Sequence, residues 1–388
     1  MPKRGLQGAA IGRPAKCVAS ALLLALTFLS SCDRKAQDDE PVRLVSWGSQ
    51  LQADLMAEIV RPAAQRGAVQ VRDDSWTGDY ADLTTRIDRG INTWDLVHVD
   101  GVYVLTPRWK QLFYQDPSRG TGQLSKTLLE SSELAEPLRQ GFAVPILEYG
   151  YLIAGRQSQF SGRPITQMTW KDFWDVRTLP GQRGMRDSPV GNVEAALESL
   201  GVKSAALYGE QDPTKIRDMV SRAFVRLAEL APNVTWWNNG EALQQGLESG
   251  DTPLTAAWSG RVRSSFNAVC PNNSQSVQAC DVQISQGSSL ISTDWWIIPA
   301  NAKNKEAASR LLKETISVAA VPGAARFAAK QGYAVPLDGA APTDSVARYF
   351  INAGSSSNKL VLGRISEQFW GKHLDWISKE WAKFRAEH

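Results

Sequence analysis

The sequence is poor in the residues on which most enzymes depend. It has only three histidines in 388 residues, namely His98, His373 and His388. It contains no G-x-S-x-G, H-E-x-x-H or G-x-x-x-x-G-K motif and no zinc-type cysteine spacing. Paired carboxylates of the glycosidase type leave no motif, and nothing in the chain points to them. We therefore expect no enzyme, no metal site and no cofactor, and we interpret His98 as a core residue in an apolar stretch.

The N-terminal apolar run, residues 18–29, is too short to serve as a transmembrane anchor, because about 20 residues are needed to span a bilayer. Basic residues precede this run, which is typical of a signal peptide. It ends in Leu-Ser-Ser-Cys at residues 29–32, which resembles the lipobox of bacterial lipoproteins. This resemblance implies a signal peptide over 1–31, a lipidated Cys32 and a tether over 32–41. A plain secretory signal is the alternative.

In lipoproteins of enteric bacteria, an aspartate after the lipidated cysteine implies retention at the inner membrane. Asp33 occupies that position here. We therefore expect a periplasmic protein that is lipid-anchored to a membrane, with the inner membrane favoured.

Only four cysteines are present, and two of them remain beyond Cys32. Cys270 and Cys280 flank a polar loop, and in an exported protein this spacing favours a disulfide. The net charge of +3 includes four basic residues and no acid in the first 31, so the remainder carries −1. There is no basic stripe, and we expect no nucleic-acid partner.

The order of elements after residue 41 predicts an α/β protein. Apolar strands alternate with helical segments over 41–101, which indicates a parallel sheet. A second α/β pattern follows from about residue 142, and the C-terminal part is helical and rich in tryptophan. Ligands of such sheets bind beyond the carboxyl ends of the strands, where Trp47, Ser49 and Asp100 are expected.

The segment 292–305, STDWWIIPANAKNK, places Asp294 directly before two tryptophans at the mouth of a strand. A buried carboxylate is costly unless a positive or hydrogen-bonding group meets it. Asp294 therefore needs a partner, which is either another part of the protein or a ligand.

Several segments together resemble bacterial solute-binding proteins of ABC importers, of the spermidine/putrescine-binding type. The resemblance covers roughly 42–385 and rests on the opening strand that ends in Trp47, DYADLTTRIDRGINTWDLVHVDGVYV, FAVPILEYGYLIAG with TWKDFWD, PLTAAWSG, and DWWIIPANAKNKEAA with KQGYAVPL. It implies a two-lobed periplasmic-binding-protein fold, type II-like, with the ligand cleft between the lobes. The implied lobes are 42–143 with about 290–335, and 144–289 with about 336–388.

The same resemblance implies a function and a set of site residues. The protein is expected to be a monomer that captures a small cationic amine, such as putrescine or spermidine, and delivers it to an ABC permease and ATPase. Asp294 would meet the ammonium, and Trp47 and Trp258 would box the methylenes. Further contacts are expected from Ser49, Asp100 and Asp187. Four other tryptophans are interpreted as core: Trp170, Trp174, Trp236 and Trp237.

The chain departs from the family pattern in ways that favour a different ligand. Gly191 stands where the second lobe has a carboxylate, and Ser292 and Gln50 replace aromatics. Arg261 and Arg326 add guanidinium groups, which bind carboxylate or phosphonate through a planar fork. The alternative ligand is therefore a zwitterion, either an ω-amino acid or an aminophosphonate, unless these arginines pair with protein acids. A tethered ligand sensor with the same fold is a further alternative.

Overall fold

The computed structural model describes residues 40–131, 134–270 and 276–388. The chain divides into two units, 1–41 and 42–388, and the second unit holds all the helices and strands described below. The predicted signal peptide, the lipidation at Cys32 and nearly all of the tether fall outside the described residues. Among those residues, no helix has the length and apolar character needed to cross a bilayer.

One mixed sheet of ten strands organises residues 42–388. Its order is β2-β1-β3-β9-β4-β7-β5-β6, with β10 paired to β9 and β8 paired to β4. The strands are β1 (Val42–Ser46), β2 (Val71–Ser75), β3 (Leu96–Asp100), β4 (Ala143–Arg156), β5 (Arg183–Arg186), β6 (Val234–Trp237), β7 (Leu254–Trp258), β8 (Val282–Ile284), β9 (Leu290–Ile297) and β10 (Gly363–Arg364).

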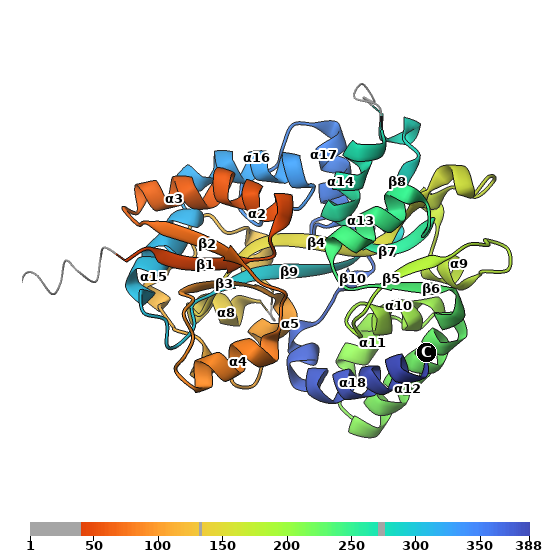
Figure 1. Ribbon diagram of the computed structural model, residues 1–388, viewed down its shortest axis with the longest axis horizontal. Coiled ribbons are helices and arrows are strands. Elements are labelled where there is room, and N and C mark those ends of the chain that lie inside the picture. The colour runs from red at the N-terminus through yellow and green to blue at the C-terminus, as the bar shows by residue number, and fades with distance from the viewer. Residues whose placement is uncertain (1–39, 132–133, 271–275) are drawn as a thin grey trace, which may run out of the picture. The chain divides into compact units, whose positions relative to one another are not determined.

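Two parallel groups of strands are joined by two long antiparallel ones. β1 pairs in parallel with β2 and β3, as the strand–helix alternation predicts, and β5 pairs in parallel with β6 and β7. β4 and β9 run antiparallel between these groups and cross the middle of the molecule side by side (Figure 1). The stretch FAVPILEYGYLIAG is predicted to form either a strand pair or a crossover. Apart from its first residue, it lies within the single strand β4.

Helices cover both faces of the sheet (Figure 1). In chain order they are α2 (Ser49–Leu55), α3 (Arg61–Arg66), α4 (Tyr80–Asp88), α5 (Gly101–Val104), α6 (Trp109–Leu112), α7 (Lys126–Leu129), α8 (Ala135–Arg139), α9 (Trp170–Trp174), α10 (Asn192–Ser199), α11 (Ser204–Gly209), α12 (Pro213–Leu230), α13 (Gly240–Ser249), α14 (Ser259–Val269), α15 (Lys305–Thr315), α16 (Val321–Gln331), α17 (Ser345–Ala353) and α18 (Glu367–Glu387).

The helix predicted from the segment that ends at Gly67 is interrupted by a π-turn, η1 (Met56–Val60), between α2 and α3. Pro62 lies just beyond this turn and has no N–H to donate to the carbonyl four residues earlier, which is that of Glu58. π-turns are one way in which a helix absorbs such a break. The helix stops at Gly67, as predicted.

Two large hydrophobic cores flank the crossing strands. One draws on residues 42–149 and 295–340 and contains Trp295 and Trp296. The other draws mainly on 151–290 and 346–384. Trp170, Trp174 and Trp237 are buried in the second core, as predicted, and Trp236 packs against it half-buried.

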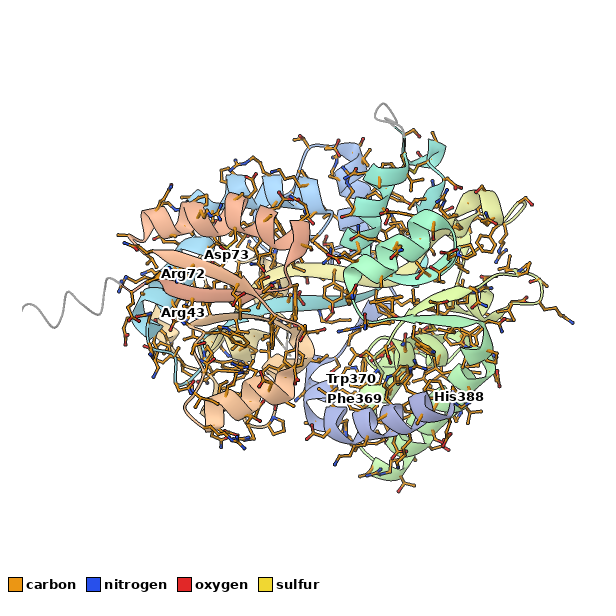
Figure 2. The ribbon with its side chains drawn as sticks, in the orientation of Figure 1. Arg43, Arg72, Asp73, Phe369, Trp370 and His388 are labelled. Carbon is orange, nitrogen blue, oxygen red and sulfur yellow. A yellow bond between two sulfur atoms is a disulfide. The ribbon has the colours of Figure 1, made fainter. Side chains whose placement is uncertain are left out.

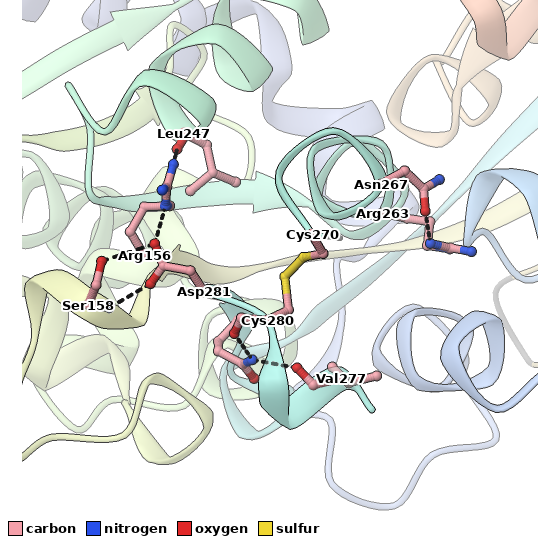
Figure 3. The surroundings of a disulfide bond; sticks show 10 residues. Arg156, Ser158, Leu247, Arg263, Asn267, Cys270, Val277, Cys280 and Asp281 are labelled. Carbon is pink, nitrogen blue, oxygen red and sulfur yellow. Dashed lines mark hydrogen bonds and ion pairs between the residues drawn. A yellow bond between two sulfur atoms is a disulfide. The ribbon is translucent and has the colours of Figure 1, made fainter. Parts of the chain in front are cut away.

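Cys270 and Cys280 form a disulfide, as their spacing predicts, with their Cα atoms 5.5 Å apart (Figure 3). Cys270 follows directly after α14, and Cys280 lies just before β8. The next residue, Asp281, accepts a hydrogen bond from Arg156 Nε of β4 at 2.6 Å. The disulfide therefore ties the end of α14 to a segment that is hydrogen-bonded to the long crossing strand β4.

We expect Cys270→Ala to lower the free energy of unfolding by about 2–3 kcal/mol, because the cross-link closes a short loop and restricts the unfolded chain. Urea denaturation of the oxidised protein measures this difference. Reductant should destabilise the parent protein by a similar amount and leave the variant unchanged. An effect of reductant on the variant would contradict the assignment.

Candidate functional site

A cavity of about 560 Å3 lies over the carboxyl ends of the parallel strands, where open α/β sheets bind their ligands. Its volume falls in the range of about 300–1,000 Å3 that is usual for small-molecule sites. Residues from both parallel groups of strands line it, so the cavity lies between these groups. The strand ends supply Trp47 after β1, Trp76 after β2, Asp100 of β3, Arg186 of β5, Asn238 after β6 and Trp258 of β7.

The two crossing strands supply the middle of the site. Asp294 of β9 lies directly opposite Asp100 of β3 on one side and opposite Leu147 of β4 on the other. Tyr149 lies two residues beyond Leu147, and alternation along a strand puts both on one face of the sheet. All four residues line the cavity. Two carboxylates thus occupy neighbouring positions in one row across the sheet.

Asp294 is 7% exposed and has no lysine or arginine partner among the described residues. Its Oδ2 atom accepts a hydrogen bond from Trp47 Nε1 at 3.1 Å and lies 2.9 Å from His98 Nε2. His98 is fully buried, and its Nδ1 atom lies 2.7 Å from Ser46 Oγ. His98 therefore links Ser46 and Asp294 through its two ring nitrogens. The Oδ1 atom of Asp294 has no hydrogen-bond partner among the described residues.

Asp100 has a cationic partner instead. Its Oδ2 atom lies 3.5 Å from an Arg186 guanidinium nitrogen and accepts a hydrogen bond from Tyr149 Oη at 3.3 Å. Burial raises the pKa of Asp100, Arg186 lowers it and the neighbouring Asp294 raises it. The net effect is a raised pKa. Arg186 is therefore the cation that offsets the charge of Asp100.

Arg186 lies between Asp100 and an aromatic face. Its guanidinium carbon is 5.0 Å from the centroid of the Trp258 ring, which is a cation–π distance. Burial acts to lower the pKa of Arg186, but Asp100 and then Tyr149 outweigh it, so the pKa is raised. Arg186 is thus a firmly charged cation inside the cavity.

Arg261 of α14 is the second cation of the cavity, and its hydrogen-bond partners are neutral. It donates to Ser49 Oγ and to Gln244 Oε1, both at 3.2 Å. A side chain at Gly240 would meet Arg261, because a Cβ there would lie 2.3 Å from its Nε. No carboxylate of the described residues is within ion-pair distance of Arg261. Ser49 has a φ of 55°, which is uncommon outside glycine, and such strain clusters at ligand sites.

Aromatic side chains form the walls. Trp47 stacks on Trp76, with ring centroids 5.4 Å apart and planes 13° apart. Trp258 meets Trp237 and Tyr149 edge to face, at 4.7 and 6.5 Å. Such faces suit the methylenes of a ligand and can also face a cation.

Five of the seven ligand-contact residues predicted from the sequence line this cavity: Trp47, Ser49, Asp100, Trp258 and Asp294. Arg261, which the sequence suggested as an alternative anion partner, also lines it. Among the described residues, no three or more histidines, cysteines and acids form a group that could hold a metal ion.

Asp187 and Arg326 lie elsewhere, which corrects their expected place. Asp187 accepts hydrogen bonds from Trp381 Nε1 and Arg385 Nε, both at 3.0 Å. Both partners belong to α18, which runs from near Phe369 and Trp370 to His388 in Figure 2. Arg326 of α16 is exposed and pairs with Glu58 at 2.6 Å. Both side chains are engaged by protein partners away from the cavity.

Sequence reasoning missed several cavity residues, among them Trp76, Tyr149, Arg186, Glu241 and Tyr333. Arg186 precedes the predicted Asp187 by one position, and alternation at the end of a strand sends neighbours to opposite sides. Burial raises the pKa of Tyr333 to about 12, with Arg261 and Asp294 acting on it in opposite directions. The place of Trp76 after a strand, like that of Trp47, was the one available clue.

The chain belongs to the family of bacterial extracellular solute-binding proteins, whose family model matches residues 55–353. A protein of this family is a non-enzymatic component of transport that binds a small-molecule ligand. Across 75% of its length the chain is 25% identical to the gamma-aminobutyric acid-binding protein of Pseudomonas aeruginosa, of which 75% is covered.

Solved structures share the periplasmic-binding-protein fold, as the sequence predicts. A GABA receptor matches with a TM-score of 0.70 at 22% identity, covering 90% of this chain and 98% of that one. MotA from A. tumefaciens B6, in complex with glucopine, matches with 0.73 at 20% identity, covering 89% and 100%. The spermidine/putrescine-binding protein PotD from Streptococcus pneumoniae is more distant, with 0.63 at 16% identity and 89% and 100% coverage.

We expect His98→Phe to lower the free energy of unfolding by about 2 kcal/mol, because Ser46 and Asp294 each lose a buried hydrogen-bond partner. Urea denaturation measures this change. His388→Phe, at the exposed end of α18, is the matched control and should stay within about 0.5 kcal/mol of the parent. Equal effects of the two substitutions would remove His98 from the role of supporting Asp294.

Proposed function

We propose that the protein is the solute-binding component of an ABC importer for a small ω-amino acid, a zwitterion of the γ-aminobutyrate type. The observation that carries this proposal is the pair of available charges in one cavity. Asp294 Oδ1 has no hydrogen-bond partner, and Arg261 has no carboxylate partner, among the described residues. A ligand with an ammonium at one end and an anion at the other satisfies both.

In this arrangement each contact has a physical task. Asp294 accepts the ammonium, since a desolvated amine needs an opposite charge. Trp47 and Trp258 cover the methylenes between the ends. Arg261 donates to the ligand carboxylate, with Ser49 beside it, and a guanidinium fits a carboxylate bidentately.

The relative that binds γ-aminobutyrate supports this ligand class over a polyamine. The charges of the cavity agree. A diamine would bring a second ammonium into a space that already holds Arg186 and Arg261. The zwitterion, which is the alternative ligand predicted from the family departures, therefore takes precedence over putrescine and spermidine.

We further propose that binding closes two lobes with the boundaries expected from the sequence. A ligand that contacts both lobes only when they are closed shifts the population toward that state. The two hydrophobic cores on either side of the crossing strands support this division. The lipid on Cys32 and its inner-membrane location stay predictions from the sequence.

A panel of matched compounds tests the ligand class. We expect γ-aminobutyrate or 5-aminopentanoate to raise the melting temperature by several degrees, since a ligand at about 100 times its Kd stabilises the native state by about 2.7 kcal/mol. Butylamine and butyrate each lack one charged end and should give little shift. Putrescine replaces the carboxylate with a second amine. A shift with putrescine alone would contradict the proposal.

Two substitutions test the two ends of the ligand. Asp294→Asn should weaken binding of the responding amino acid by more than about tenfold, as expected for the loss of a buried charge partner. Arg261→Met should weaken it by a similar factor. Titration calorimetry measures both. The controls are Asp187→Asn and Arg326→Met, whose side chains lie outside the cavity, and these should bind as the parent does. Unchanged affinity in Asp294→Asn would remove Asp294 from the site.

A further inference from the structure

We propose that Arg186 is a selectivity residue that excludes diamines by occupying Asp100, the second carboxylate of the cavity. The inference rests on the proposed function, because it explains how a cavity with two adjacent acids can prefer a ligand with only one ammonium. Asp100 and Asp294 lie directly opposite each other on β3 and β9. Without Arg186 this row would present two carboxylates to a ligand.

The contacts of Arg186 account for the difference between the two acids. Its guanidinium lies 3.5 Å from Asp100 Oδ2, and that same oxygen accepts the Tyr149 hydroxyl at 3.3 Å. No ion pair of the described residues joins Arg186 to Asp294. One carboxylate is therefore paired within the protein, and the other stays open to a ligand ammonium.

The position of Arg186 is fixed independently of Asp100. It is the last residue of β5, and its guanidinium lies over the Trp258 ring at 5.0 Å. Its main-chain carbonyl accepts a hydrogen bond from Asn192 Nδ2 at 2.7 Å. The cation is thus held over an aromatic wall of the cavity, where it repels a second ammonium as well as neutralising Asp100.

Arg186 also differs from the other cavity cation. Arg261 contacts only neutral partners and suits a ligand carboxylate, whereas Arg186 has a carboxylate of its own. The two arginines therefore favour a zwitterion in different ways. Arg261 attracts the anionic end, and Arg186 removes the second site for a cationic end.

Arg186→Met tests this inference, because methionine keeps an apolar side chain on Trp258 and removes the charge. Titration calorimetry of the full chain at pH 8 compares putrescine with γ-aminobutyrate or the responding homologue. We expect the Kd for putrescine to fall by about tenfold or more relative to the parent, and the Kd for the amino acid to change by less than about threefold. Arg326→Met, the matched arginine outside the cavity, should change neither.

A second variant guards against a loss of folding. Arg186→Met with Asp100→Asn removes both charges of the pair, so it should bind the amino acid and show no gain for putrescine. A gain that persists in the double variant would overturn the role of Asp100. Loss of amino-acid binding in both variants, with unchanged melting temperatures, would overturn the inference by placing Arg186 on the ligand carboxylate. A parent protein that prefers putrescine would instead refute the proposed function itself.

Discussion

The site depends on one constraint, which is that Asp100 and Asp294 are direct neighbours across β3 and β9. Like charges at opposed positions of an antiparallel pair repel each other and destabilise the sheet. The protein meets this cost differently at each acid. Asp294 hydrogen-bonds with Trp47 and His98, and Asp100 receives the guanidinium of Arg186.

The difference between the two sets of partners gives the cavity its chemical character. Trp47 and His98 hold Asp294 through hydrogen bonds, whereas Arg186 offsets the charge of Asp100. Of these two adjacent acids, Asp294 is therefore the one without an arginine or lysine partner among the described residues. A buried charge of this kind favours a ligand that brings one opposite charge. Arg261 lines a neighbouring groove together with Ser49 and Gln244, to which it donates hydrogen bonds. Its charge then favours an anion at the far end of that ligand.

Local pattern predicted much of the fold, because strand alternation and glycine stops agree with the structure over 42–101 and around Asp294. What it could not give was the pairing of β9 between β3 and β4, since Asp294 lies 194 positions from its partner Asp100 and 147 from its partner Leu147. The errors at the site have the same origin. Asp187 and Arg186 differ by one position at a strand end, and only the fold decides which faces the cavity. The error at Arg326 has a local explanation. Phe327 and Ala324 of α16 are buried, and Arg326 lies on the exposed face of that helix.

The crossing strands carry the site on one face and a polar tie on the other. Leu147 and Tyr149 line the cavity, and alternation turns Glu148 between them to the opposite face. There Arg364 of β10 contacts Glu148, and its Nη1 donates to Thr293 of β9 at 2.6 Å. Thr293 immediately precedes Asp294, so the carboxylate proposed to bind the ligand and the tie share adjacent residues of one strand. The proposed bending between the two cores would therefore involve β4, β9 and β10 together, and an ammonium on Asp294 would act on the strand that carries this tie.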